Sequence, residues 1–366
     1  MKNIRILHTA DLHLDSAFEA LPAGKAAVRR AEQRELLRRI AELARTERAD
    51  IVLLPGDIFD GGGTYFETGA ELVRCLQDIP VPVFIAPGNH DPYDRHSPYA
   101  KLTLPENVRL FTKRDIEYTE LSELGVRVYG AAFTGASDGP DIAGLHAERT
   151  EGVWNILCAH AEVGFDPVNE RALAESGLDY AALGHIHKAS GLRRAGNTWY
   201  SWPGCPEGRG FDETGEKTVS IIELSDSGCT LRTVCIASRR YEILPVDVTG
   251  IDPLLAVHTV LPENTARDVY RIILTGEVDT PPDMSRLRRN LDDCFFALQL
   301  RDETRLRQDV WERADEDSLR GIFLRRLREK YAAAQGSEER ELVEQAARWG
   351  LAALDNMEEV VRHEDQ

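Results

Sequence analysis

The stretch Leu183-Gly184-His185-Ile186-His187 places two histidines one residue apart behind a glycine, directly after the apolar run that begins at Tyr180. On a continuous strand, two side chains so spaced would point to opposite faces of a sheet. Where the strand ends and a loop begins, the two imidazoles can each face a different metal ion in one cleft. The pair alone is weak evidence, so its meaning depends on the other metal-ligand residues of the chain.

Four more clusters of metal-ligand residue types precede this pair, and each follows an apolar, strand-like run. They are Asp11-Leu12-His13, Gly56-Asp57-Ile58-Phe59-Asp60, Gly88-Asn89-His90-Asp91 and Ala159-His160. Taken singly, a strand-end aspartate is more often a turn former or a helix cap, and a histidine after a strand is more often half buried in the core. Five clusters in this order, each at a strand end, instead indicate one shared site.

The order of strands and helices predicts an α/β domain at the start of the chain. Strands are expected over residues 4–8, 51–54 and 81–86, and helices over 25–48 and 66–78. Open α/β sheets collect their ligand sites at the carboxyl ends of strands, so the clusters are expected to meet there. Strands predominate after residue 108, which favours two sheets packed face to face with helices outside.

A chain of 366 residues is too long for a single ordinary hydrophobic core, so more than one domain is expected. We expect a main domain over 1–240, a small α+β domain over 241–300 and a helical region over 301–366. In the helical region, two apolar stripes are expected either to pack together as a hairpin or to leave a face for another chain. The stripes are Leu319, Ile322, Phe323 and Leu327, and Leu342, Val343, Ala346, Trp349 and Leu354.

A net charge of −18 argues against a protein that coats nucleic acid by bulk electrostatics. A local basic rim can still exist, and its candidates are Lys188, Arg193, Arg194 and Arg209, although a solvated turn explains them equally well. No apolar run reaches the about 18–20 residues that span a bilayer, and Met1–Arg5 leads into a strand without a signal peptide. Six scattered cysteines without a CxxC motif predict reduced thiols and a cytoplasmic protein without membrane contact.

Carboxylate, amide and imidazole ligands together suit manganese, iron or zinc rather than calcium. The set is Asp11, His13, Asp57, Asn89, His160, His185 and His187. Seven ligands are too many for one ion and natural for two divalent ions that share a carboxylate, an arrangement that promotes displacement at phosphorus. Asp57 is the expected bridge. His90 is expected to act on bound substrate, and Asp60 or Asp91 to orient histidines.

The five motifs in this order resemble the calcineurin-like metallophosphoesterase superfamily over residues 1–235. Asp11-Leu12-His13-Leu14-Asp15-Ser16 together with Gly56-Asp57-Ile58-Phe59-Asp60 resembles, more narrowly, the bacterial DNA-repair exonuclease branch. That branch includes the nuclease subunit of SbcCD and YhaO-type relatives. The loop Pro203–Phe211 resembles the same branch. The chain has Asp15 where glycine is common in this branch, and its capping domain is short. Both features favour the YhaO-type relatives, and the short cap leaves open which DNA ends can enter.

The resemblance implies one metal on Asp11, His13, Asp57 and His187, a second on Asp57, Asn89, His160 and His185, and His90 as the catalytic histidine. It also implies a four-layer αββα nuclease domain (1–240), a capping domain (241–300) and C-terminal helices (301–366) that dock on an SMC-like ABC ATPase.

The expected activity is manganese-dependent phosphodiester hydrolysis of DNA in repair, as a 3′→5′ exonuclease with single-strand endonuclease activity. Two alternatives stay open: a small-molecule phosphatase or cyclic-nucleotide phosphodiesterase with the same metals, and a scaffold subunit with a vestigial site. The sequence does not decide the oligomeric state, a homodimer included.

Overall fold

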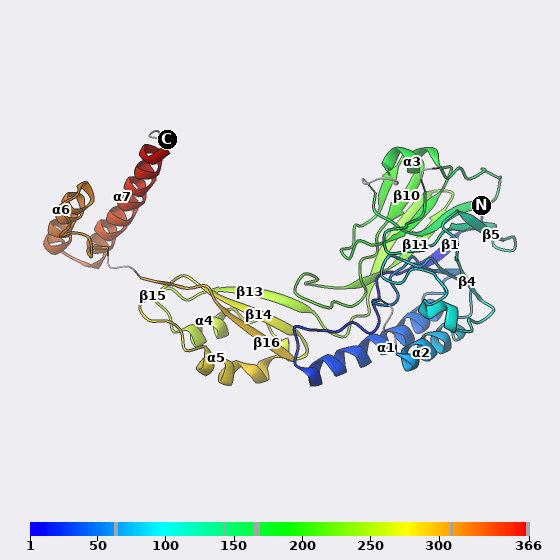
Figure 1. Cartoon of the computed structure of the whole chain (residues 1–366), viewed down its shortest axis with the longest axis horizontal. Helices are drawn as coiled ribbons and strands as arrows, with labels where there is room; N and C mark the ends of the chain where they lie inside the picture. The colour runs from blue at the N-terminus through cyan, green and yellow to red at the C-terminus, as the bar shows by residue number, and fades with distance from the viewer. Residues whose placement is uncertain (62–64, 143, 164–168, 308–309, 364–366) are drawn as a thin grey trace. The chain divides into compact units, whose positions relative to one another are not determined.

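The structure, a computed structural model, describes residues 1–61, 65–142, 144–163, 169–307 and 310–363 (Figure 1). The chain divides into two compact units. The first contains Met1–Pro245, Val260–Ile273 and Ser285–Arg301, and the second contains Val246–Thr259, Leu274–Met284 and Asp302–Gln366. The boundaries near residues 240 and 300 stay a prediction.

The first sheet has six strands in the order β12-β11-β1-β2-β3-β4. They are β1 (Ile4–His8), β2 (Ile51–Leu54), β3 (Val83–Ile85), β4 (Val108–Leu110), β11 (Thr218–Ser225) and β12 (Gly228–Cys235). Neighbours from β1 to β4 run parallel, and β11 is antiparallel to both β1 and β12. The carboxyl ends of β1, β2 and β3 therefore meet at one edge.

The second sheet also has six strands, in the order β5-β6-β7-β8-β10-β9. They are β5 (Glu117–Leu121), β6 (Val126–Gly130), β7 (Trp154–His160), β8 (Tyr180–Gly184), β9 (Arg193–Ala195) and β10 (Thr198–Ser201). The four inner strands are parallel, and the edge strands β5 and β9 are antiparallel to their neighbours.

Both faces of each sheet are buried at the inner strands, and alternate residues of an inner strand point to opposite faces. The inner strands therefore have continuous apolar sequences. Ile51 and Leu53 of β2 pack toward the second sheet, whereas Val52 and Leu54 pack toward the helices. Helices α1 (Ala23–Thr46) and α2 (Phe66–Gln77) cover the first sheet. The short α3 (Glu170–Glu175) and the segment around Leu145 cover the second. The predicted four-layer αββα sandwich is confirmed, with a thin outer layer over the second sheet.

After residue 240 the chain forms a three-stranded sheet in the order β13-β14-β16. Its strands are β13 (Tyr241–Asp247), β14 (Val269–Thr275) and β16 (Ala297–Asp302), accompanied by α4 (Pro253–Val260) and α5 (Met284–Leu291). Two short strands, β15 (Glu277–Val278) and β17 (Arg305–Leu306), pair in parallel. The prediction that the chain is helical from residue 302 is therefore wrong up to about 318, because the segment first completes this strand pair.

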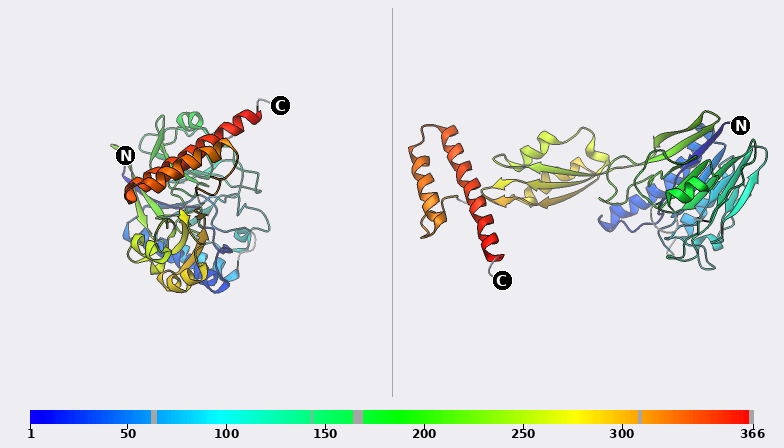
Figure 2. Two further views of the ribbon diagram at one scale, coloured as in Figure 1. Left: turned by 90° about the vertical axis from the view of Figure 1, so that its left-hand side faces the viewer. Right: turned by 90° about the horizontal axis from the view of Figure 1, so that it is seen from above.

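The last two helices, α6 (Leu319–Ala333) and α7 (Ser337–His363), lie side by side as a hairpin (Figure 2). Its small core contains Leu324 and Ala347, with Phe323 and Leu327 packed against them. Leu319, Ile322, Leu342 and Trp349 are exposed instead. Leu324 and Ala347 belong to neither predicted stripe, and of the stripe residues only Phe323 and Leu327 pack against this core. The prediction that the stripes pack on each other is therefore wrong for most of their residues, and several large apolar side chains stay exposed. No helix within the described ranges is long and apolar enough to cross a membrane.

Candidate metal centre

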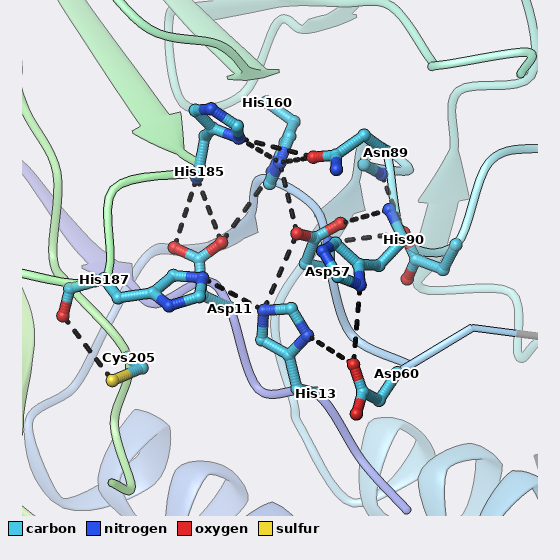
Figure 3. Close-up of polar contacts among 12 residues, drawn as sticks. Asp11, His13, Asp57, Asp60, Asn89, His90, His160, His185, His187 and Cys205 are labelled. Carbon is cyan, nitrogen blue, oxygen red and sulfur yellow. Dashed lines mark hydrogen bonds and ion pairs between the residues drawn. The ribbon is translucent and has the colours of Figure 1, made fainter. Parts of the chain in front are cut away.

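The structure brings all seven predicted metal ligands together at the carboxyl ends of the inner strands (Figure 3). Asp11 and His13 follow β1, Asp57 follows β2, and Asn89 follows β3. His160 ends β7, and His185 and His187 follow β8. Both sheets therefore contribute ligands to one site, because the carboxyl ends of their inner strands lie close together.

One group of donors consists of Asp11, His13, Asp57 and His187, with one ligand atom of each within 4.8 Å of the others. Nε2 of His13 lies 3.1 Å from Nε2 of His187 and 3.6 Å from Oδ2 of Asp57. Burial lowers the pKa of His13 to about 4, so its imidazole is neutral at pH 7. These are the four residues that the resemblance implied for one ion.

Two carboxylates hold the histidines of this group from behind. Oδ1 of Asp60 lies 3.1 Å from Nδ1 of His13, and Oε1 of Glu213 lies 2.8 Å from Nδ1 of His187. A carboxylate accepts the Nδ1 proton, which leaves the Nε2 lone pair free for a metal. The two lone pairs thus converge on one point between the imidazoles.

A second group contains His160, His185, Asn89 and, again, Asp57. Nε2 of His160 lies 2.9 Å from Oδ1 of Asn89 and 3.3 Å from Oδ2 of Asp57. Nδ1 of His185 lies 3.3 Å from the same Asn89 oxygen and 3.3 Å from Nε2 of His160. The other His160 nitrogen, Nδ1, is 3.1 Å from the carbonyl oxygen of Pro55, so it carries the donated proton and Nε2 faces the oxygens.

The charges of this second group require a positive partner. Burial lowers the pKa of His160, but the hydrogen bond and the negative charge of Asp57 outweigh it and raise that pKa to about 9. In the first group, burial raises the pKa of Asp11 to about 6. A bound cation can replace the proton between His160 and Asp57, because a cation and a proton can each interact with both Nε2 of His160 and Oδ2 of Asp57.

Four of these residues have an unusual backbone. Asp11, His13, Asp57 and His185 have φ angles of 55°, 44°, 50° and 99°, in the region that favours glycine. Such a conformation costs on the order of 1–3 kcal/mol at each position and persists where the surroundings enforce it. The strained turns aim the side chains inward as the chain leaves each strand. Nothing in the sequence indicated them.

Asp91 supports the turn after β2. Its buried carboxylate accepts hydrogen bonds from the backbone N–H groups of Ile58 (2.8 Å), Phe59 (3.1 Å) and Gly88 (2.7 Å) and from the hydroxyl of Tyr99. Of the two carboxylates expected to orient histidines, Asp60 contacts His13, whereas Asp91 holds backbone.

Gly88 allows a close approach to the shared carboxylate. A Cβ atom on this residue would overlap the Asp57 carboxylate, so a side chain there would displace the residue shared by both groups.

His90 lies at the exposed side of the cluster. Its backbone N–H donates to Oδ1 of Asp57 at 2.9 Å, which fixes the residue beside the shared carboxylate. Its side chain is 47% exposed, and its Nδ1 lies 3.4 Å from Oδ1 of Asp60. The imidazole is therefore accessible to a bound substrate while Asp60 orients it.

The four candidates for a basic rim occupy different surroundings. Lys188 is exposed just after His187. The guanidinium groups of Arg193 and Arg194 lie over the rings of Trp202 (5.8 Å) and Trp199 (4.9 Å). Arg209 forms ion pairs with Glu213 at 2.8 Å and Asp60 at 3.6 Å, so it supports the carboxylates behind the histidines. Contact of these residues with DNA stays a prediction.

Glu213 is the functional residue that sequence reasoning missed. Its side chain is buried against His187 and Arg209. It lies two residues beyond the loop Pro203–Phe211, and a glutamate among 62 acidic residues has no local feature that marks it.

Fold and site together define a metallophosphoesterase. The calcineurin-like phosphoesterase family model matches residues 4–189, about half of the chain, and the chain belongs to this family. One relative is "Uncharacterized metallophosphoesterase YhaO" of Bacillus subtilis, 26% identical over 87% of this chain and 83% of the relative.

Two further relatives carry nuclease or DNA-repair names. "DNA double-strand break repair protein Mre11" of Aeropyrum pernix is 26% identical over 67% of this chain and 64% of its own length. A subunit of the nuclease SbcCD of Bacillus subtilis is 26% identical over 60% of this chain and 66% of its own length. This chain thus spans just under two thirds of these two relatives.

Proposed function

We propose that this protein is a manganese-dependent phosphodiesterase that acts on DNA, as a 3′→5′ exonuclease with single-strand endonuclease activity. The observation that carries the proposal is the convergence of acceptors. Nε2 of His13 and Nε2 of His187 face each other at 3.1 Å while carboxylates hold both Nδ1 atoms. Buried lone pairs arranged in this way need a cation between them.

The donor set fits two divalent ions. Asp11, His13, Asp57 and His187 would hold one, and Asp57, Asn89, His160 and His185 would hold the other. Oxygen and imidazole donors without a cysteine thiolate suit manganese, iron or zinc, and of these we propose manganese. When bound, such a pair supplies charge neutralisation for the phosphate and a water of lowered pKa.

The remaining residues of the site either transfer a proton to the substrate or orient a metal-binding histidine. His90 is accessible and oriented by Asp60, so it can stabilise charge on a phosphate oxygen or donate a proton to the leaving oxygen. Glu213, held by Arg209, fixes the tautomer of His187.

The choice of DNA rests on the named relatives and on the chain beyond residue 240. The names Mre11 and nuclease SbcCD favour a nuclease over a small-molecule phosphatase. We assign residues 1–240 to hydrolysis, 241–300 to the cap and 301–366 to partner binding. The exposed Leu319, Ile322, Leu342 and Trp349 supply the apolar face that an SMC-like ABC ATPase would cover.

A paired digestion tests this function. End-labelled linear duplex DNA and a chromogenic phosphomonoester are incubated with Mn²⁺, with EDTA and with Asp57→Ala as the inactive control. Shortening of the DNA from its 3′ ends with Mn²⁺ alone supports the nuclease. Hydrolysis of only the monoester identifies a phosphatase, and no hydrolysis of either substrate with metal bound identifies a scaffold.

A further inference from the structure

A pocket of about 520 Å³ opens beside the proposed metal site, and its size falls in the range of small-ligand sites, about 300–1,000 Å³. The loop after β8 contributes His185, His187 and Lys188, and the loop before β11 contributes Glu213, Thr214 and Lys217. The two histidines belong to the proposed metal site (Figure 3), and they also line the pocket, which is therefore continuous with that site.

Lys217 is the unexplained residue of this pocket. It is only 8% exposed, and its ammonium has no hydrogen bond or ion pair with any residue in the part of the chain that the structure describes. The stem of this side chain is buried, whereas its ammonium stays accessible from the pocket, where an anion can form charge-assisted hydrogen bonds with it.

The acidic residues beside Lys217 do not form an ion pair with its ammonium, which is therefore available to bind an anion. Both oxygens of the Glu213 carboxylate are engaged: Oε1 with His187 and the Arg209 guanidinium, and Oε2 with the Arg209 backbone N–H at 2.7 Å. Asp212 lies in the exposed wall of the pocket. The lysine is thus a cation held beside the site, while Arg209 is committed to its ion pairs.

We propose that Lys217, together with the exposed Lys188, binds a phosphate of the nucleic-acid strand that neighbours the scissile phosphate. The subsite rests on the proposed function and gives it a substrate preference. A strand with several phosphates gains binding free energy from Lys217, whereas a substrate with a single phosphate does not. In a chain with a net charge of −18, such a local cation supplies attraction that the bulk charge does not.

Two substrates separate this role from a role in the metal site. Octathymidylate has neighbouring phosphates, and bis(p-nitrophenyl) phosphate has one. Lys217→Met, which keeps the length of the side chain, should raise the KM for octathymidylate by about 10- to 100-fold. It should leave kcat and KM for the small diester, the metal content and the melting temperature unchanged.

Substituted strands locate the subsite. Octathymidylates with a single neutral methylphosphonate linkage, moved along the strand, should show one position where the wild-type KM rises. In Lys217→Met that position should have no further effect. Lys188→Met should give the same pattern more weakly. Lys113→Met, at an exposed lysine paired with Glu117, serves as the control, and Asp212→Asn should lower the KM by up to about fivefold.

A binding measurement in EDTA keeps the subsite separable from catalysis. The anisotropy of fluorescein-labelled octathymidylate should report weaker binding by Lys217→Met even if the wild type does not cleave DNA, an outcome that would overturn the proposed function alone. Lys217→Gln replaces Lys217→Met if the latter does not fold. Unchanged octathymidylate binding and KM in the folded variant, or equal losses for both substrates, would overturn the subsite.

Discussion

At the level of single residues, the site depends on the groups that accept the Nδ1 proton of three of its histidines. Asp60 behind His13, Glu213 behind His187 and the Pro55 carbonyl behind His160 each accept a proton from Nδ1. This leaves three Nε2 atoms directed at Asp57, Asn89 and one another. The tautomers of the histidines are thus determined by residues that touch no metal.

Replacement of Glu213 by glutamine tests this dependence. Without the carboxylate, His187 loses the charge that holds its Nδ1 proton, and metal affinity should fall by about 10- to 100-fold. Calorimetric titration with Mn²⁺ measures the change. Glu216→Gln is the control, because this nearby glutamate is exposed and pairs with Arg240. An unchanged affinity in Glu213→Gln would show that His187 is held by other means.

His90 should behave differently from the ligands. His90→Ala or His90→Asn should lower kcat by about 10²–10⁴-fold, because the imidazole is proposed to act on the transition state. The metal content should stay near that of the wild type if His90 acts on substrate, although His90 also lies in a group of possible ligands with His13 and Asp60. Mass spectrometry of bound metal is the measurement, and metal loss would make His90 a ligand.

Among the elements, the inner strands could be predicted because both of their faces are buried. β2 lies at the expected residues, Ile51–Leu54, and β8 begins at Tyr180, as the apolar run indicated. The edge strands β5 and β9 escaped prediction because their half-exposed sequences, Glu117–Leu121 and Arg193–Ala195, contain more polar than apolar residues. β13 escaped because Pro245 resembled a domain boundary.

The convergence of the seven candidate ligands could be predicted from their positions after strands, since parallel strands bring their ends to one edge. The positive φ angles at Asp11 and His185 could not, because tertiary contacts impose them on residues that ordinarily avoid them. The contact between Glu213 and His187 was equally hidden, because it joins two loops through the fold.

The C-terminal hairpin allows a test of its exposed face. Replacement of Leu319, Ile322 and Trp349 by alanine should change hairpin stability little, because Trp349 is 81% exposed and the other two are also exposed. It should abolish co-purification with an SMC-like ATPase of the same organism. Leu324→Ala is the contrasting control: it should lower the free energy of unfolding of the hairpin by about 2–5 kcal/mol. Retained co-purification of the triple variant would assign partner binding elsewhere.

In the molecule as a whole, hydrolysis and partner binding are proposed to reside in different parts of the chain. A chain that ends after Arg307 keeps the pair β15–β17, in which the Arg307 N–H donates to the Val278 carbonyl at 2.8 Å. This chain should retain manganese-dependent hydrolysis and lose the ATPase. Activity assays and co-purification measure the two outcomes. Continued co-purification, or collapse into insoluble protein, would show that the helices belong to the core.

The proposed dimetal site is built around Asp57, whose Oδ2 lies 3.6 Å from Nε2 of His13 and 3.3 Å from Nε2 of His160. Its decisive test is the manganese content of the whole chain and of Asp57→Ala, with the exposed Asp78→Ala as control. We expect about two equivalents in the wild type and the control, and close to none in Asp57→Ala, because two neighbouring cations need an anion between them. Two equivalents retained by Asp57→Ala would contradict the shared site.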